Sequence, residues 1–134
     1  MDIVQCQRAK EDELTSSSCY DMTNRYFKQI LLAEIGEEGQ KRLSSTSAVV
    51  AGCGGLGTVI ANSLVRFGIG RLTIVDRDFI EIDNLARQVL FDEEDIKKGL
   101  PKAIAAAEKL RRINSGITIE PVVADLTAEN IERI

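Results

Sequence analysis

Apolar and polar residues follow one another along the chain in blocks that predict a helical segment and then an alternating series of strands and helices. Residues 1–23 are mostly polar, so we expect them to form a flexible leader. From Asn24 to Ile35, apolar residues recur at three- and four-residue steps. This spacing predicts a helical segment over residues 24–46.

The remaining part, residues 47–134, alternates short apolar runs with amphipathic stretches. Continuous apolar runs are typical of strands buried in a parallel sheet, and the amphipathic stretches predict helices. The predicted strands are residues 48–51, 71–76 and 117–123, and the predicted helices are residues 56–67, 101–113 and 127–134.

This order predicts an α/β fold with a Rossmann-like parallel sheet and helices on both faces. Residues 47–134 correspond to the N-terminal half of such a nucleotide-binding domain, and we expect its second half to be missing. An acidic cluster at residues 92–95 is expected to begin a short helical turn, where negative charge complements the helix dipole.

The turn after the first predicted strand carries candidate chemistry. Gly52, Gly54 and Gly57 fit the pattern G-x-G-x-x-G, which brings a strand into a helix around a bound phosphate. The second predicted strand ends in Asp76, about 20 residues further on, where an acidic residue hydrogen-bonds the ribose of a nucleotide. Together these features predict nucleotide binding.

Composition and charge narrow the function classes. A formal net charge of −4 argues against general nucleic-acid binding. Neither a membrane-spanning run nor a secretory signal is recognisable, so we expect a cytoplasmic protein. The chain has no histidine, which excludes histidine-based triads and bases. Cys6, Cys19 and Cys53 form no C-x-x-C pair, so no metal site is expected within this chain.

The loop after Asp76 adds groups that a dinucleotide site has little need for. Arg87 and Lys102 suit a triphosphate, because a guanidinium binds two phosphate oxygens at once and an ammonium acts as a point charge. We expect them near the carboxyl end of the sheet, where ligands bind in such folds. Asp78, Asn84 and Gln88 share this region, as ligand contacts or as residues that order the loop.

These motifs together resemble one family. From Arg25 to the C-terminus the chain is similar to the MoeB/ThiF/HesA adenylyltransferases, which activate sulfur-carrier and ubiquitin-like proteins and are related to ubiquitin-activating enzymes. The motifs that carry the resemblance are Arg25-Tyr26-x-x-Gln29, Gly52-x-Gly54-Gly55-Leu56-Gly57, Gly68-x-Gly70, Asp76-x-Asp78, Asn84-Leu85-x-Arg87-Gln88 and Gly99-x-x-Lys102-Ala103.

The resemblance implies ATP and magnesium as cofactors and a small carrier protein as partner. The C-terminal carboxylate of that carrier would attack the α-phosphate and release pyrophosphate. Arg87 and Lys102 would be the catalytic residues, by stabilising charge during transfer. The residues that the resemblance assigns to the nucleotide are Gly52, Gly54, Gly55, Leu56, Gly57, Asp76, Asp78, Asn84, Arg87, Gln88 and Lys102.

The family also implies a homodimer in which the first helices reach the neighbouring subunit. Arg25 and Lys28 are the candidates for this contact, although the family commonly has arginine where this chain has Lys28. The magnesium-binding aspartate, the zinc-binding cysteines and the thioester cysteine are expected beyond Ile134. We therefore expect this chain to be inactive as an adenylyltransferase by itself.

Three other functions stay open at this point. A tRNA-modifying dehydratase of the same family would use the same motifs on a small carboxylate. An NAD-binding redox or sensor module would prefer NAD to ATP and would not need Arg87 or Lys102. A non-catalytic partner, like the inactive half of a heterodimeric activating enzyme, would bind nucleotide weakly.

Overall fold

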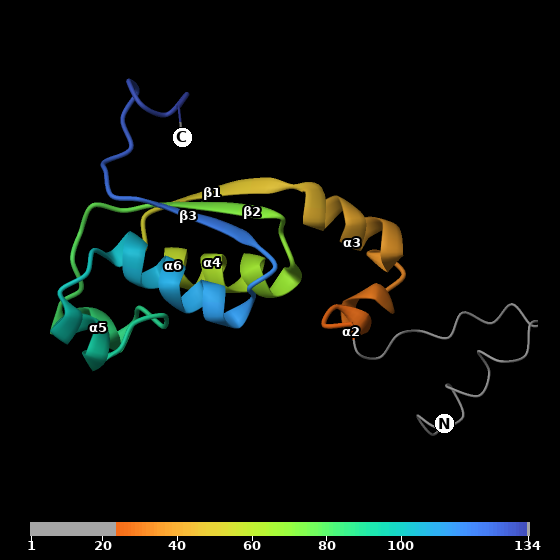
Figure 1. Cartoon of the computed structure of the whole chain (residues 1–134), viewed down its shortest axis with the longest axis horizontal. Coiled ribbons are helices and arrows are strands. Elements are labelled where there is room, and N and C mark those ends of the chain that lie inside the picture. The colour runs from red at the N-terminus through yellow and green to blue at the C-terminus, as the bar shows by residue number, and fades with distance from the viewer. Residues whose placement is uncertain (1–23, 134) are drawn as a thin grey trace, which may run out of the picture.

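A three-stranded parallel sheet forms the centre of the computed structural model, which describes residues 24–133. The strands are β1 (Ser47–Ala51), β2 (Arg71–Val75) and β3 (Thr118–Val122), and they lie in the order β1-β2-β3 (Figure 1). Their registers align the last residues of the three strands, since Ala51 pairs with Val75 and Val75 with Val122. The carboxyl ends therefore meet at one edge of the sheet.

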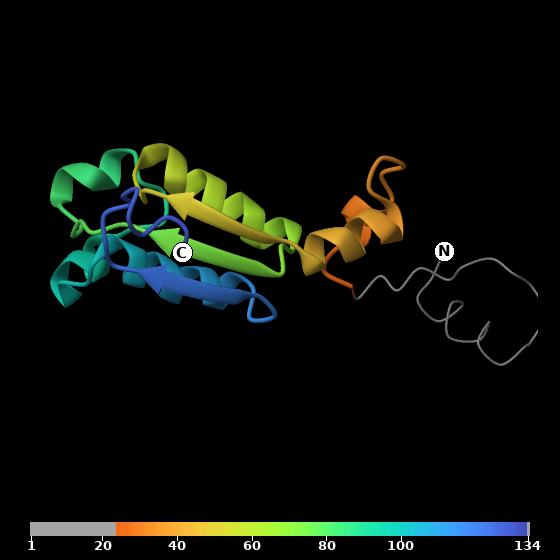
Figure 2. The same ribbon diagram turned by 90° about the horizontal axis from the view of Figure 1, so that it is seen from above.

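Two long helices connect the strands, α4 (Gly55–Phe67) and α6 (Lys102–Ile113). Both lie on the same face of the sheet (Figures 1 and 2). Within the described residues, the expectation of helices on both faces is therefore corrected. The predicted Rossmann-like fold with a parallel sheet is confirmed. The strands are added in one direction, and right-handed crossovers then place both helices on one side.

The hydrophobic core lies between this sheet face and the two helices. Its fully buried members come from all of these elements, so they pack the helices onto the strands. On the opposite face Val49 is half exposed. The fully buried core side chains include Val65, Leu72, Ile74, Ala106 and Leu110.

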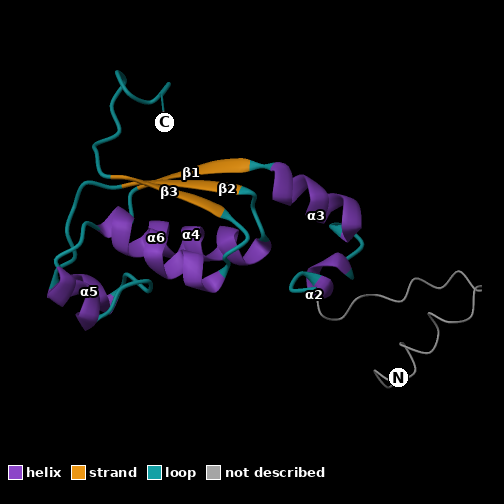
Figure 3. Ribbon diagram, in the orientation of Figure 1, coloured by secondary structure: helices purple, strands orange, loops and turns teal. Residues whose placement is uncertain are grey.

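The segment ahead of the sheet contains α2 (Phe27–Ile30) and α3 (Gly36–Ser45), at the amino ends of the strands (Figure 3). The structure is helical here as predicted, but it is broken. Helix α2 has only four residues, and α3 begins at Gly36, whose φ of +58° is unfavourable for other residues. The predicted leader lies outside the described residues.

The connection between β2 and α6 contains the 3₁₀ helix η1 (Ile82–Ala86) and helix α5 (Glu93–Lys98). The acidic cluster begins α5, as expected. Asp92 is its N-cap, and its side chain accepts hydrogen bonds from the backbone N–H groups of Glu94 and Asp95.

The prediction of a helix after β3 is wrong for residues 127–133, of which residues 128–133 form turns. The side chain of Asn130 accepts a hydrogen bond from the N–H of Thr127 and donates one to the carbonyl of Asp125. Such side-chain bonds to nearby backbone compete with helix formation. Within residues 24–133, no helix is both long and apolar enough to cross a membrane.

Candidate functional site

The glycine loop runs from the end of β1 into α4. Gly52 has a φ of +88°, and its N–H donates to the carbonyl of Val75 at 2.7 Å. A side chain at Gly57 would place its Cβ 1.8 Å from the carbonyl oxygen of Gly52, so only glycine permits this close turn. By contrast, the space beside Gly54 is open for at least 4 Å. The loop is therefore tight on its inner side and accessible on its outer side.

Helix α4 begins at this loop without a capping side chain. The first N–H groups of a helix have no partner within the helix, and they carry partial positive charge. Gly55 and Leu56 belong to this first turn, and Leu56 is 82% exposed. This helix end can hold an anion such as a phosphate.

Asp76 joins the glycine loop to the end of β2. Its Oδ2 accepts a hydrogen bond from the N–H of Cys53 at 2.5 Å, and its Oδ1 accepts one from the N–H of Asp78 at 2.8 Å. A carboxylate has about four acceptor positions. Asp76 can therefore shape both loops and still accept hydrogen bonds from a ligand.

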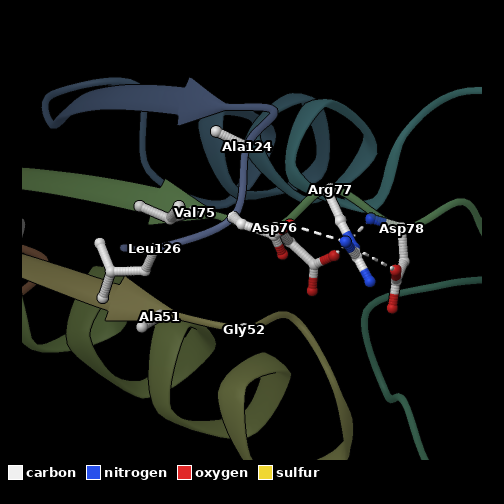
Figure 4. Close-up of a pocket in the computed structure, with 9 residues that line it drawn as sticks. Ala51, Gly52, Val75, Asp76, Arg77, Asp78, Ala124 and Leu126 are labelled. Carbon is white, nitrogen blue, oxygen red and sulfur yellow. Dashed lines mark hydrogen bonds and ion pairs between the residues drawn. The ribbon is translucent and has the colours of Figure 1, made fainter. Parts of the chain in front are cut away.

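A hollow of about 280 Å³ lies where the carboxyl ends of the three strands meet (Figure 4). Asp76 and Arg77 border it on the side of β2, and Ala124 borders it on the side of β3. Its position follows the rule that ligands bind at the carboxyl ends of parallel strands. The full lining is Ala51, Gly52, Val75, Asp76, Arg77, Asp78, Ala124, Asp125 and Leu126.

Sequence reasoning missed the part of this lining that follows Asp76 and β3. Arg77 and Asp125 form an ion pair at 2.6 Å across the hollow, and Leu126 closes one side. The available signal was position alone, because these residues lie within three residues of the ends of two predicted strands of the same sheet. No recognised motif includes them.

Lys102 lies at the first position of α6 and is only 7% exposed. Its Nζ is 3.5 Å from Oδ2 of Asp78, and its backbone N–H donates to the carbonyl of Asp78 at 2.8 Å. The pKa of the nearby Cys53 thiol is raised to about 12, mainly by burial and also by the charge of Asp76, while the charge of Lys102 acts to lower it. Lys102 therefore supplies positive charge beside the glycine loop.

Arg87 lies against the first turn of α4. A Cβ at Gly55 would be 3.5 Å from the carbonyl oxygen of Arg87 and 3.7 Å from its Cγ. The guanidinium Nη1 donates to the carbonyl of Asp83 at 3.0 Å, and the side chain is exposed. Arg87 and Lys102 thus approach the glycine loop from two different elements.

Asn84 and Gln88 are buried beside Arg87. Asn84 completes a capping box with Glu81 at the start of η1, so its side chain orders the loop. Gln88 is 2% exposed, and its Oε1 has no hydrogen-bond partner within residues 24–133. The structure thus brings the predicted residues from Gly52 to Lys102 to one edge of the sheet.

Arg25 and Lys28 lie at the opposite, amino-terminal edge. Arg25 Nη1 donates to the carbonyl of Ile113 at 2.8 Å, at the end of α6. Lys28 is exposed, with its Nζ 5.3 Å from the centroid of the Phe27 ring. Neither residue contributes to the hollow of its own chain.

The other residues of the first motif attach the N-terminal segment to the core. The hydroxyl of Tyr26 accepts a hydrogen bond from Asn114, and Gln29 donates to the carbonyl of Phe67 at 2.9 Å. Gly68 has a φ of +85°, and a Cβ there would lie 2.5 Å from the Tyr26 ring. This docking role was not predicted from the sequence.

Within residues 24–133, no three aspartate, glutamate, cysteine or histidine side chains are grouped as metal ligands. The acidic residues of the site are engaged with other partners. Asp76 accepts two backbone hydrogen bonds, Asp78 faces Lys102, and Asp125 pairs with Arg77.

Comparison with known proteins gives consistent results. The ThiF family model matches residues 26–134. A sulfur carrier protein ThiS adenylyltransferase from Bacillus subtilis (strain 168) is 52% identical over 110 residues, covering 82% of this chain and 33% of that protein. The chain thus spans about a third of the length of this curated relative.

Solved structures agree. E. coli MccB with ATP matches with a TM-score of 0.66 and 32% identity, over 71% of this chain and 28% of that chain. An E. coli tRNA N6-threonylcarbamoyladenosine dehydratase, TcdA, in complex with AMP matches with a TM-score of 0.69 and 32% identity, over 73% of this chain and 39% of that chain. The resemblance drawn from the motifs is confirmed, and the chain belongs to the ThiF family.

Proposed function

We propose that this chain is the ATP-binding part of an adenylyltransferase that activates the C-terminal carboxylate of a small sulfur-carrier or ubiquitin-like protein. The observation that carries the proposal is the meeting of the glycine loop, Asp76, Arg87 and Lys102 at one edge of the sheet. A ThiS adenylyltransferase as a relative supports the choice of substrate.

In this proposal the adenosine occupies the hollow at the carboxyl ends of the strands. Asp76 accepts hydrogen bonds from the ribose, and the open side of Gly52 and Gly54 allows the phosphates to approach the backbone. The N-terminus of α4 then faces the phosphates, which explains why this helix has no capping side chain. Asp78, Asn84 and Gln88 hold Lys102 and the loop of Arg87 in place.

The reaction would form one bond and break one. A carboxylate oxygen of the carrier attacks the α-phosphorus of ATP, the bond to the bridging oxygen breaks, and pyrophosphate leaves with the electron pair. No proton must be removed from the nucleophile, so the absence of histidine is no obstacle. Arg87 and Lys102 would stabilise the charge that develops on the phosphates, and magnesium would enter with ATP.

The proposal includes a cytoplasmic homodimer that binds neither nucleic acid nor membrane, with residues 24–46 as the helical segment and residues 47–134 as the nucleotide-binding half domain. Lys28 is the better candidate for a contact with the second subunit. Its side chain is exposed, whereas Arg25 is engaged with Ile113 of its own chain.

A calorimetric titration with Mg–ATP and, separately, with NAD tests this function. We expect binding of Mg–ATP that weakens about tenfold in Arg87→Ala and in Lys102→Ala, since each removes a charged contact to phosphate. Preference for NAD, unaffected by these substitutions, would support a redox or sensor module instead.

A tRNA dehydratase is the second candidate from the same family, because TcdA with AMP shares the fold. In a full-length protein, pyrophosphate exchange that depends on a carrier protein rather than on tRNA would separate the two.

A further inference from the structure

Residues 82–98 form a segment that bridges the glycine loop and α6. At one end, the backbone of Arg87 lies against Gly55. At the other end lies Asp92, the N-cap of α5, which contacts Lys109 of α6. The backbone N–H of Arg87 donates to the carbonyl of Asn84 at 3.1 Å, and its guanidinium hydrogen-bonds only the carbonyl of Asp83 among the described residues. Both partners belong to the segment, so the segment itself determines where the guanidinium lies.

Lys109 on α6 holds the beginning of α5. Its Nζ lies 2.6 Å from Oδ2 of Asp95 and also hydrogen-bonds Oδ2 of Asp92. The side chain of Asp95 is only 5% exposed, and it accepts a hydrogen bond from the N–H of Asp92 at 2.9 Å. Lys109, Asp92 and Asp95 therefore form a closed cluster, which we call the lysine clamp.

The charges of the lysine clamp depend on one another. Burial disfavours the charged ammonium of Lys109, but its hydrogen bonds with Asp92 and Asp95 outweigh this effect and raise its pKa. The hydrogen bond from Lys109 likewise lowers the pKa of Asp92. Removal of Lys109 leaves a buried carboxylate, Asp95, without a counter-charge, which is costly.

Short contacts connect the lysine clamp with Arg87. Leu90 and Phe91, directly before Asp92, are buried in the core. The N–H of Phe91 donates to the carbonyl of Gln88 at 3.1 Å, and the N–H of Gln88 donates to the carbonyl of Asn84 at 2.9 Å. This chain of turns leaves little freedom between the clamp and the guanidinium.

We propose that Lys109 is a positioning residue, which fixes the start of α5 on α6 and thereby holds Arg87 against the glycine loop for binding phosphate. This inference rests on the proposed function, because the phosphate that Arg87 would bind is that of the proposed ATP. No other described ion pair joins α5 to α6, because the remaining pair of α5, Lys97 with Glu94, is internal to that helix.

Hydrogen–deuterium exchange of the full chain tests the positioning directly. We expect Lys109→Met to speed exchange of the amides of residues 82–98 while β1 and β2 stay protected, and Lys109→Arg to restore the slow exchange. Lys97→Met is the matched control, since it removes an exposed pair from the same helix. Asp92→Asn provides a milder second variant, because asparagine still caps a helix but carries no charge for Lys109.

Calorimetry with Mg–ATP tests the consequence for binding. We expect Lys109→Met to weaken binding about fivefold, Lys109→Arg to bind as the wild type does, and Lys97→Met to have no effect. In the double variant Arg87→Ala/Lys109→Met, we expect binding no weaker than in Arg87→Ala alone. If Lys109 only stabilised the fold, Lys109→Met would weaken Mg–ATP binding equally in the wild type and in Arg87→Ala.

The outcomes separate this inference from the proposed function. Unchanged exchange of residues 82–98 in Lys109→Met, or equal weakening in both backgrounds, overturns the role of Lys109. A folded wild-type chain that binds NAD rather than Mg–ATP overturns the proposed function. In that case the exchange data still decide whether Lys109 holds the segment.

Discussion

The carboxylate of Asp76 accepts a hydrogen bond from the backbone N–H of Cys53 at 2.5 Å. The acid expected to bind ribose therefore also fixes the loop expected to bind phosphate. Deleting the side chain of Asp76 would therefore remove the ribose contact and disturb the phosphate-binding loop at the same time.

We expect Asp76→Ala to lower the free energy of unfolding by about 2 kcal/mol, because the N–H groups of Cys53 and Asp78 lose a charged acceptor. Asp76→Asn keeps one carbonyl oxygen, so its stability should be intermediate. Urea unfolding followed by circular dichroism measures both. Wild-type stability in Asp76→Ala would contradict the role of Asp76 in shaping the loop.

Substitution by alanine should have different effects on stability at two glycines of the same loop. Gly57→Ala places a methyl group against the carbonyl of Gly52, so we expect a loss of about 3 kcal/mol or more in the free energy of unfolding. Gly54 has a φ of −81° and open space beside it, so Gly54→Ala should change stability by less than about 0.5 kcal/mol. Its methyl group occupies space proposed for phosphate, so it should weaken Mg–ATP binding. The stabilities come from urea unfolding, and equal losses in the two variants would contradict the geometry.

Cys53 should make stability depend on alkaline pH. Its pKa is about 12 in the fold, against 9.0 for a model thiol, mainly because the side chain is buried. Below pH 9 the thiol is protonated in both states. Between pH 9 and 12 only the unfolded chain loses this proton, so the free energy of unfolding falls, by at most about 1.4 kcal/mol per pH unit.

Urea unfolding at pH 8 to 11, compared with that of Cys53→Ala, isolates this contribution. We expect the variant to lose less stability over this range than the wild type. Thiol labelling of Cys53 in a Cys6→Ser/Cys19→Ser background should occur only on unfolding. Rapid labelling of the folded protein at pH 8 would show that the thiol is not buried as described.

The docked N-terminal segment gives a prediction that does not involve the ligand. Tyr26→Phe removes the acceptor for Asn114, which is 2% exposed, and should cost about 1 kcal/mol in the free energy of unfolding. Mg–ATP affinity should stay unchanged, because Tyr26 lies at the other end of the sheet. Urea unfolding and calorimetry check the two parts. A loss of affinity without a loss of stability would contradict this assignment.

Much of the fold could be predicted because local signals agree with tertiary packing. Helix α4 begins at the glycine loop and ends just before Gly68, whose φ of +85° stops a helix, so its limits were visible in the sequence. The turns after β3 were not visible, because there the side chain of Asn130 outweighs a weak helical pattern. Nor does local sequence show on which side of a sheet each crossover helix lies.

The motif residues of the candidate site could be predicted from their order in the sequence, but Arg77, Asp125 and Leu126 and the interactions within the site could not. The hydrogen bond between Asp76 and Cys53 depends on the conformation of two loops that are 23 residues apart. The contact of Arg25 with Ile113 spans 88 residues, so its position away from the hollow required the folded structure. Sequence patterns specify which side chains are available, and tertiary structure decides which of them meet.

Different groups of residues stabilise the two ends of the sheet, so the two ends can be engineered separately. Tyr26, Gly68 and Asn114 hold the amino ends together, while Gly52 and Asp76 shape the carboxyl ends. Strands of five residues separate the two groups by about 16 Å, beyond the range over which substitutions usually influence one another. We therefore expect that substitutions which stabilise the amino ends leave the proposed nucleotide site at the carboxyl ends unchanged.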